Sequence, residues 1–154
     1  MAFCKGFELK IFCVANQKGG VGKTTTTVNL AAGLASIGQR VLLVDLDPQG
    51  NATMGSGVDK RELALSVYDV LLASATVAEC RVKTPWAESG QATYDVLGAN
   101  RELAGAEIEL VGLDQRELRL RHALQAVNQD YDFVLIDCPP SLSLLTLNGL
   151  CAAH

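Results

Sequence analysis

An apolar run that ends in a glycine-rich turn constrains the fold of this chain more than any other feature. Residues 9–15 read Leu-Lys-Ile-Phe-Cys-Val-Ala, and residues 18–25 read Lys-Gly-Gly-Val-Gly-Lys-Thr-Thr. The first run predicts a strand that is buried on both faces. Residues 24–37 then have the spacing of a helix, and Gly38 stands where a left-handed cap ends one. The inward face expected for this helix consists of Leu30, Leu34 and Ile37.

The turn also has the chemistry of a polyphosphate site. Backbone N–H groups of such a turn converge on one point, where the positive end of the helix dipole adds to them. We expect Gly19, Gly20 and Gly22 to adopt conformations or close approaches that a Cβ atom would forbid. Lys23 is expected to reach the β- and γ-phosphate oxygens, and the Thr24 hydroxyl to bind Mg²⁺.

Strands and helices alternate along the rest of the chain. Residues 40–45, 93–97 and 131–137 read as further strands, so about four strands are expected. Residues 66–74 and 114–128 read as helices, and another begins near Ser141. Asp114 to Glu117 resembles a capping box, with Leu120, Leu124 and Val127 on the inward face of the helix that follows. The pattern predicts an α/β fold with a mostly parallel sheet and helices on both faces.

Three carboxylates are expected at the edge of the sheet that carries the turn. Asp45 and Asp47 follow the second strand, and Asp137 ends the last apolar strand. Ligands of open parallel sheets bind beyond the carboxyl ends of the strands, so these acids and the turn should form one site. Asp137 is expected to hold Mg²⁺, while Asp45 and Asp47 would act on the metal shell and on the attacking water.

The turn departs from the general phosphate-binding motif in an informative way. The pattern G-x-x-x-x-G-K-[ST] requires a glycine at position 17, where this chain has Gln17, and a second lysine, Lys18, opens the loop. This box resembles the deviant Walker A sequence of the ParA/MinD group of P-loop ATPases. Residues 45–53 (Asp-Leu-Asp-Pro-Gln-Gly-Asn-Ala-Thr), Asp-Cys-Pro-Pro-Ser at 137–141 and Leu-Leu-Thr-Leu-Asn at 144–148 resemble the ParA/Soj partitioning ATPases more specifically.

The resemblance implies a P-loop NTPase fold with ATP and Mg²⁺ as cofactors. It implies that Lys18 reaches the ATP of a partner subunit, that Asp47 positions the hydrolytic water and that Asp45 belongs to the outer metal shell. The predicted catalytic residues are therefore Lys18, Lys23 and Asp47. The predicted nucleotide-binding residues are Lys18, Gly19, Gly20, Val21, Gly22, Lys23, Thr24 and Thr25, and the predicted metal site comprises Thr24, Asp45, Asp47 and Asp137.

The same resemblance implies a role in chromosome or plasmid partitioning. The family works as an ATP-dependent homodimer that binds non-specific DNA and is stimulated by a ParB-type centromere-binding protein. The resemblance therefore implies a nucleoid-associated protein. We expect a cytoplasmic protein without a membrane segment, because the sequence shows neither a signal peptide nor an apolar run of 18 residues. Residues 1–8 are expected to be a weakly patterned leader that could be disordered, and residues 9–154 a P-loop ATPase domain that is incomplete at its C-terminus.

Other functions remain open on the sequence alone. A net charge of −4 indicates no overall basic field that would attract nucleic acid, so any DNA contact must be local. A MinD-type division-site ATPase that associates with membrane has the same turn, although residues 47–53 favour the ParA type. A truncated, inactive remnant is a third possibility. An iron–sulfur carrier on the same fold is disfavoured, because the five cysteines are scattered.

Overall fold

The computed structural model describes residues 8–20 and 22–154. The leader expected at residues 1–8 therefore lies outside the described residues except for Glu8, and so does Val21.

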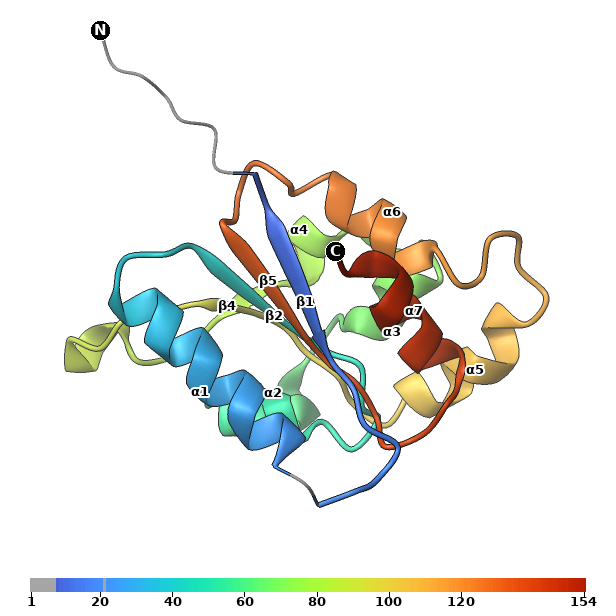
Figure 1. Cartoon of the computed structure of the whole chain (residues 1–154), viewed down its shortest axis with the longest axis horizontal. Helices are drawn as coiled ribbons and strands as arrows, with labels where there is room; N and C mark the ends of the chain where they lie inside the picture. The colour runs from blue at the N-terminus through green and yellow to red at the C-terminus, as the bar shows by residue number, and fades with distance from the viewer. Residues whose placement is uncertain (1–7, 21) are drawn as a thin grey trace, which may run out of the picture.

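The expected parallel sheet is present (Figure 1). Its strands stand in the order β1-β5-β2-β4-β3. All neighbouring strands are parallel except β3, which pairs antiparallel with β4 and lies in a segment that the sequence left unassigned. The insertion of β5 between β1 and β2 joins segments that are far apart in the chain. The strands are β1 (Lys10–Val14), β2 (Val41–Asp45), β3 (Val82–Lys83), β4 (Asp95–Leu97) and β5 (Phe133–Asp137).

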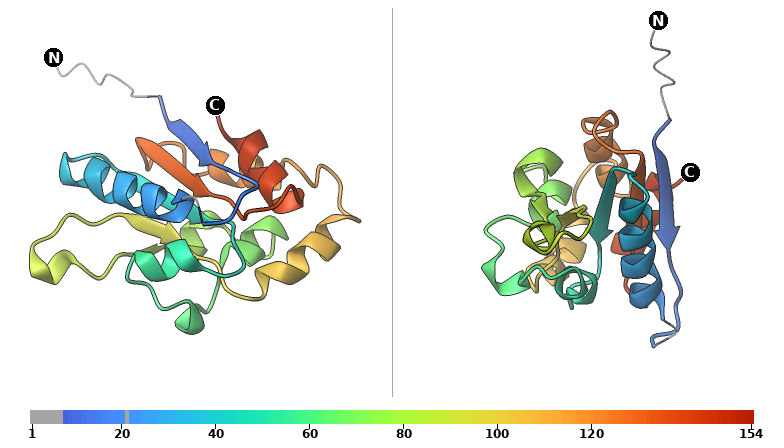
Figure 2. Two further views of the ribbon diagram at one scale, coloured as in Figure 1. Left: turned by 60° about the horizontal axis from the view of Figure 1, so that its bottom comes forward. Right: turned by 90° about the vertical axis from the view of Figure 1, so that its left-hand side faces the viewer.

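Helices cover both faces of the sheet, as expected (Figure 2). The α1 face carries α1 (Lys23–Ser36) and α2 (Asn51–Gly55), and the α7 face carries α3 (Val67–Leu71), α4 (Val77–Cys80), α5 (Leu103–Leu110), α6 (Arg119–Gln125) and α7 (Leu144–Ala152). Residues alternate between the two faces along each strand. On β2, Leu43 packs on the α1 face and Leu42 on the α7 face. Single 3₁₀ turns occur at Lys60–Glu62 and Ala87–Ser89.

The prediction of the inward face of α1 was wrong for Leu30 and Ile37, whereas Leu34 is partly buried and packs against the core of this face. The helix buries Thr27, Ala31 and Ala35 against the sheet, whereas Leu30 is 42% exposed and Ile37 is 70% exposed. Small side chains allow the helix axis to lie close to the strands. Apolar spacing alone does not reveal this preference, because the leucines and the alanines share a helical period. The predicted cap is present, since Gly38 has φ 86° and its N–H donates to the Ala35 carbonyl at 3.0 Å.

The predicted start of α6 was also wrong. Residues 114–117 lie in turns rather than in a capping box, and the helix begins at Arg119. A distant residue satisfies one of its first amides, because the Leu120 N–H donates to Asn148 Oδ1 of α7 at 3.1 Å. The predicted inward residues Leu120, Leu124 and Val127 are all buried.

Candidate functional site

The glycine turn connects β1 to α1 with the backbone geometry expected of a phosphate site. Gly20 has φ 71° and Gly22 has φ 82°, in the left-handed region that glycine adopts without strain. Gly22 is also the residue that caps the N-terminus of α1. At Gly19 the expectation is not met within the protein, because an added Cβ atom would meet only Pro140, at an ordinary 3.8 Å.

Asp137 lies directly beside the start of α1. It shares its face of the sheet with Leu135, which packs on the α1 face. The Thr24 hydroxyl donates to Asp137 Oδ2 at 2.8 Å, and the Thr27 hydroxyl lies 3.4 Å from Asp137 Oδ1. Burial raises the pKa of the Asp137 carboxyl, against the opposing effects of the Thr24 hydrogen bond and the Lys23 charge. The last strand and the turn therefore meet as predicted.

Asp45 is fully buried and is held by the loop that follows it. Its Oδ2 accepts hydrogen bonds from the Thr53 N–H at 2.9 Å and the Thr53 hydroxyl at 2.8 Å. Its Oδ1 accepts one from the Asp47 N–H at 3.0 Å. Burial raises the pKa of Asp45 to about 7, although these three hydrogen bonds favour the charged form. The structure thus places Asp45 behind Asp47, where it fixes the backbone.

Asp47 lies at the surface of the site. Its side chain is 8% exposed, and its Oδ1 accepts a hydrogen bond from the Gln49 N–H at 2.9 Å. The charge of Asp47 also contributes to raising the pKa of Asp137.

One cleft of about 740 Å³ brings most of the predicted residues together. The residues that line it are Gly19, Gly20, Gly22, Lys23, Thr24, Thr25, Asp47, Gln49, Asn51, Pro140 and Ser141. Lys18 is not among them: it is exposed on the loop before the cleft, where its N–H donates to Asn16 Oδ1 at 2.9 Å. Asp45 and Asp137 lie behind the lining, and Val21 is outside the described residues.

Several residues of the site have no role assigned from sequence. Gln49, Asn51, Pro140 and Ser141 line the cleft, and all of them lie in the segments after β2 and β5 that carry the family resemblance. The contact of Thr27 with Asp137 could have been predicted from the sequence, because Thr27 lies one helical turn after Thr24 on the same face of α1. The contact of Thr53 with Asp45 could not have been predicted from spacing, because only the folded loop brings these two residues together.

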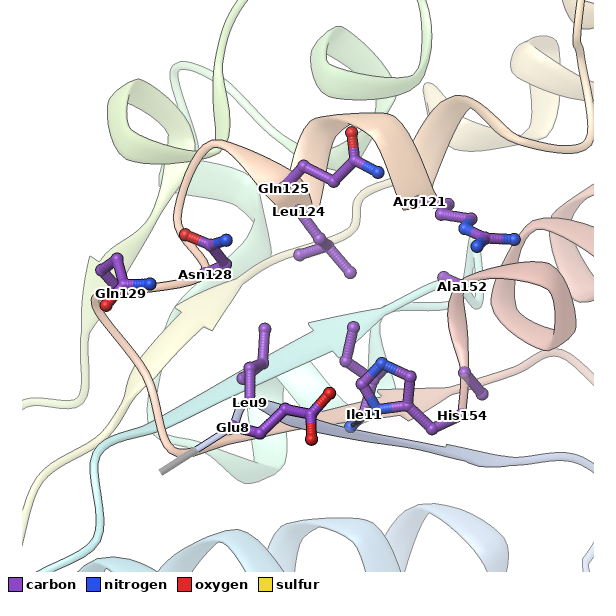
Figure 3. Close-up of a pocket in the computed structure, with 11 residues that line it drawn as sticks. Glu8, Leu9, Ile11, Arg121, Leu124, Gln125, Asn128, Gln129, Ala152 and His154 are labelled. Carbon is purple, nitrogen blue, oxygen red and sulfur yellow. Dashed lines mark hydrogen bonds between the residues drawn. The ribbon is translucent and has the colours of Figure 1, made fainter. Parts of the chain in front are cut away.

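A second cavity, of about 350 Å³, lies at the opposite end of β1 (Figure 3). Leu124 and Asn128 line it from α6 and the loop that follows, and Leu9 and His154 line its other side. His154 Nδ1 accepts a hydrogen bond from the Ile11 N–H at 3.2 Å. This cavity contains none of the predicted site residues.

The helices within residues 8–20 and 22–154 include no apolar stretch of the length that a bilayer-spanning segment requires.

Comparison with known proteins identifies the relatives of this chain. A family model described as an AAA domain matches residues 9–154. The sporulation initiation inhibitor protein Soj of Bacillus subtilis (strain 168) is 56% identical over 144 residues, which cover 94% of this chain and 55% of that protein. The chromosome partitioning protein ParA of Myxococcus xanthus (strain DK1622) is 50% identical over 145 residues, which cover 94% and 49%.

A similar structure has also been solved with nucleotide. It is described as cobyrinic acid a,c-diamide synthase from Mycobacterium smegmatis with bound ATP analog and magnesium. The TM-score is 0.89 at 48% identity, and the match covers 95% of this chain and 57% of that one. The chain spans about half the length of the curated relatives it matches. The family match, the glycine turn and the parallel sheet agree, and the chain therefore belongs to the AAA-domain family, with proteins named Soj and ParA among its relatives.

Proposed function

We propose that this chain binds ATP with Mg²⁺ and hydrolyses it to ADP as part of a ParA-type machine that partitions chromosomal or plasmid DNA. The proposal rests on the cleft, which is lined by the glycine turn, Lys23 and Asp47. Behind this lining, Asp137 accepts a hydrogen bond from the Thr24 hydroxyl. The names of the Soj and ParA relatives support the partitioning role.

The phosphates are bound by the turn and the start of α1. Amides of the turn and the positive end of the helix dipole attract the polyphosphate. Lys23 adds a full positive charge at the same end of the helix, in the cleft. Phosphoryl transfer requires mainly positioning and charge stabilisation from a protein, and this arrangement supplies both.

The residues behind the turn fit a magnesium ion. The Thr24 hydroxyl donates its hydrogen to Asp137, so its oxygen keeps lone pairs free for a metal, and Mg²⁺ prefers oxygen ligands of this kind. Thr24 would bind the ion directly with Asp137 and Asp47 beside it, whereas the buried Asp45 would act only through the backbone that carries Asp47. An ion held by these residues would neutralise negative charge on the phosphate groups.

Asp47 is the residue that we assign to the attacking water. The Gln49 N–H donates to one carboxylate oxygen of Asp47, and the Asp47 N–H donates to the Asp45 carboxylate. These two hydrogen bonds keep the Asp47 side chain at the cleft. A carboxylate held in this way orients a water molecule and accepts its proton.

Lys18 is assigned to the partner's nucleotide in an ATP-dependent homodimer. Its exposed position on the loop before the cleft leaves it accessible to a second subunit. In that arrangement its ammonium would stabilise charge that develops during phosphoryl transfer. Non-specific DNA and a ParB-type centromere-binding protein are the proposed partners of the dimer, which places it at the nucleoid.

The proposal is tested by ATP turnover with and without DNA and a ParB-type protein, on this chain and on a longer polypeptide that carries it. Stimulation by both supports partitioning. Stimulation by lipid vesicles instead would indicate a MinD-type role, and dependence on cobyrinic acid would indicate the activity that names the M. smegmatis relative. Absence of ATP binding to either polypeptide would indicate an inactive remnant.

A pair of lysine variants tests the site separately from the partners. Lys23→Ala removes the charge in the cleft and should abolish ATP binding, measured by calorimetry. Lys10→Ala removes an exposed lysine at the start of β1 and should leave binding unchanged. Equal affinities for the two variants would contradict the assignment of the cleft.

A further inference from the structure

Two cysteines from distant parts of the chain lie in contact on the α7 face of the sheet. Cys13 of β1 stands opposite Ile136 in the register of β1 with β5, so Cys138, two residues further on, projects from the same face. The Cys138 N–H donates to the Val14 carbonyl at 3.2 Å, which keeps the two chain segments side by side. The two Sγ atoms are 3.2 Å apart.

The backbone of α7 closes over the two sulfur atoms. A Cβ atom added at Gly149 would lie 2.6 Å from Cys138 Sγ and 3.2 Å from Cys13 Sγ. Only glycine therefore allows the helix to approach this closely. The packing of α7 on the two sulfur atoms and the pairing of β1 with β5 hold the sulfur atoms together.

The surroundings of the two thiols differ in access to solvent. Cys138 is fully buried, whereas Cys13 is partly exposed near the end of β1. Cys80 and Cys151, the other cysteines in the described part of the chain, make no such sulfur contact there. A disulfide has an S–S length of about 2.05 Å, so an approach of about 1.2 Å between Cys13 and Cys138 would form one.

We propose that Cys13 and Cys138 form a dithiol site that a peroxide oxidises reversibly to an intramolecular disulfide. The Cys13 sulfur attacks the O–O bond, which gives a sulfenic acid on Cys13 and releases water or an alcohol. The Cys138 sulfur then attacks the sulfenic sulfur, the S–S bond forms and a water molecule leaves. Two thiol hydrogens leave in the products, and the peroxide is reduced.

The proposed disulfide would connect two segments that form the nucleotide cleft. It joins the strand that leads into the glycine turn to the residue that follows Asp137. In reducing compartments, disulfides of this kind are usually transient and respond to redox change. The chemistry concerns the thiols alone and is independent of whether the chain hydrolyses ATP.

The test maps the bridge in a variant with Cys4→Ser and Cys151→Ser, so that Cys13, Cys80 and Cys138 remain. The folded protein is treated with hydrogen peroxide, blocked with an alkylating reagent and cut with trypsin, which releases peptides 11–18, 62–81 and 122–154. We expect peptides 11–18 and 122–154 to be linked with the loss of two hydrogen atoms, and dithiothreitol to separate them. Free thiols at both positions, a link to peptide 62–81, or a link that forms only in urea would overturn the proposal.

Single variants then separate the roles of the two sulfurs. With Cys138→Ser added, Cys13 should stop at the sulfenic acid, which dimedone labels. With Cys13→Ser added, the buried Cys138 should stay a free thiol. Cys80→Ser is the matched control and should leave the bridge intact. Dimedone labelling of Cys138 rather than Cys13 would contradict the assigned order of attack.

Discussion

Asp45 and Asp47 stand two residues apart, yet the fold gives their carboxylates different surroundings. Asp47 has one oxygen bonded to the Gln49 amide and lines the cleft. Asp45 is fully buried and accepts three hydrogen bonds, two of them from Thr53. We infer that Asp47 acts on the reacting groups and that Asp45 acts through the backbone that carries Asp47.

Asp47→Ala should therefore separate binding from hydrolysis. The variant keeps the glycine turn and Lys23, so ATP affinity should be close to that of the unchanged chain. Turnover should fall by about 10²–10⁴-fold, the usual contribution of a positioned acid–base group. Steady-state turnover and calorimetric ATP affinity measure the two effects. Asp114→Ala, at an exposed position outside the cleft, is the control, and equal turnover of the two variants would remove the role of Asp47.

Asp45 should make the stability of the fold depend on pH. Its pKa is about 7 in the folded protein and about 4 in an unfolded chain. Between these values the folded state binds more protons, so the free energy of unfolding falls as pH rises from about 4 to about 7. Asp137, whose pKa is also raised, contributes in the same direction.

Urea unfolding at pH 5 and pH 8 measures this effect. The difference between the two pH values should be smaller in Asp45→Asn than in the unchanged chain, with a remainder from Asp137. The same pH difference in both proteins would show that Asp45 titrates normally in the fold.

At the scale of elements, α7 determines where α6 begins. Asn148 of α7 is fully buried, and its Oδ1 accepts the hydrogen bond from the Leu120 N–H. Its Nδ2 donates to the carbonyls of Arg116 at 2.8 Å and Leu144 at 2.9 Å. The start of α6 is therefore capped by a side chain of a neighbouring helix and not, as expected, by a residue close to it in the sequence.

Asn148→Ala should destabilise the protein. The change leaves the Leu120 N–H buried without its partner, which costs about 1–3 kcal/mol in the free energy of unfolding. Urea unfolding measures the loss. Asn128→Ala, at an exposed position after α6, is the matched control and should change stability little. A similar loss of unfolding free energy in both variants would show that the hydrogen bond between Asn148 and Leu120 does not stabilise the protein specifically.

At the scale of the whole molecule, the proposed chemistry requires two subunits. Lys18 lies outside the lining of its own cleft, so its proposed role needs a partner. Turnover per subunit should then rise with protein concentration. Lys18→Ala should lower the maximum by about 10²–10³-fold while each subunit still binds ATP.

Mixing two inactive variants tests this action between subunits. In a mixed dimer, the ATP of the Lys18→Ala subunit has an intact Asp47 and receives Lys18 from the Asp47→Ala subunit. Turnover should therefore recover on mixing. A mixture that stays inactive, with dimers shown by sedimentation, would contradict the role of Lys18 in trans.

Local features of the fold and the site were readable from the sequence. The glycine turn was predicted because phosphate binding by backbone amides depends on contiguous residues, and Gly20 and Gly22 have the left-handed conformations it requires. The strands β2 and β5 were predicted because burial on both faces leaves an almost continuous apolar run. The prediction of burial on both faces was wrong for β1, because this strand lies at the edge of the sheet and its Phe12 is 48% exposed. The two-residue strand β3 carries no such signal and was missed.

Contacts between distant residues were decided by the tertiary structure. The order of the strands places Asp137 2.8 Å from the Thr24 hydroxyl across a separation of 113 residues. The same packing selects the small-residue face of α1, supplies Asn148 to α6 and brings Cys13 to Cys138. Sequence pattern reports how one segment divides between core and solvent. Which partner fills the space beside it depends on the packing of all segments together, and no single segment contains that information.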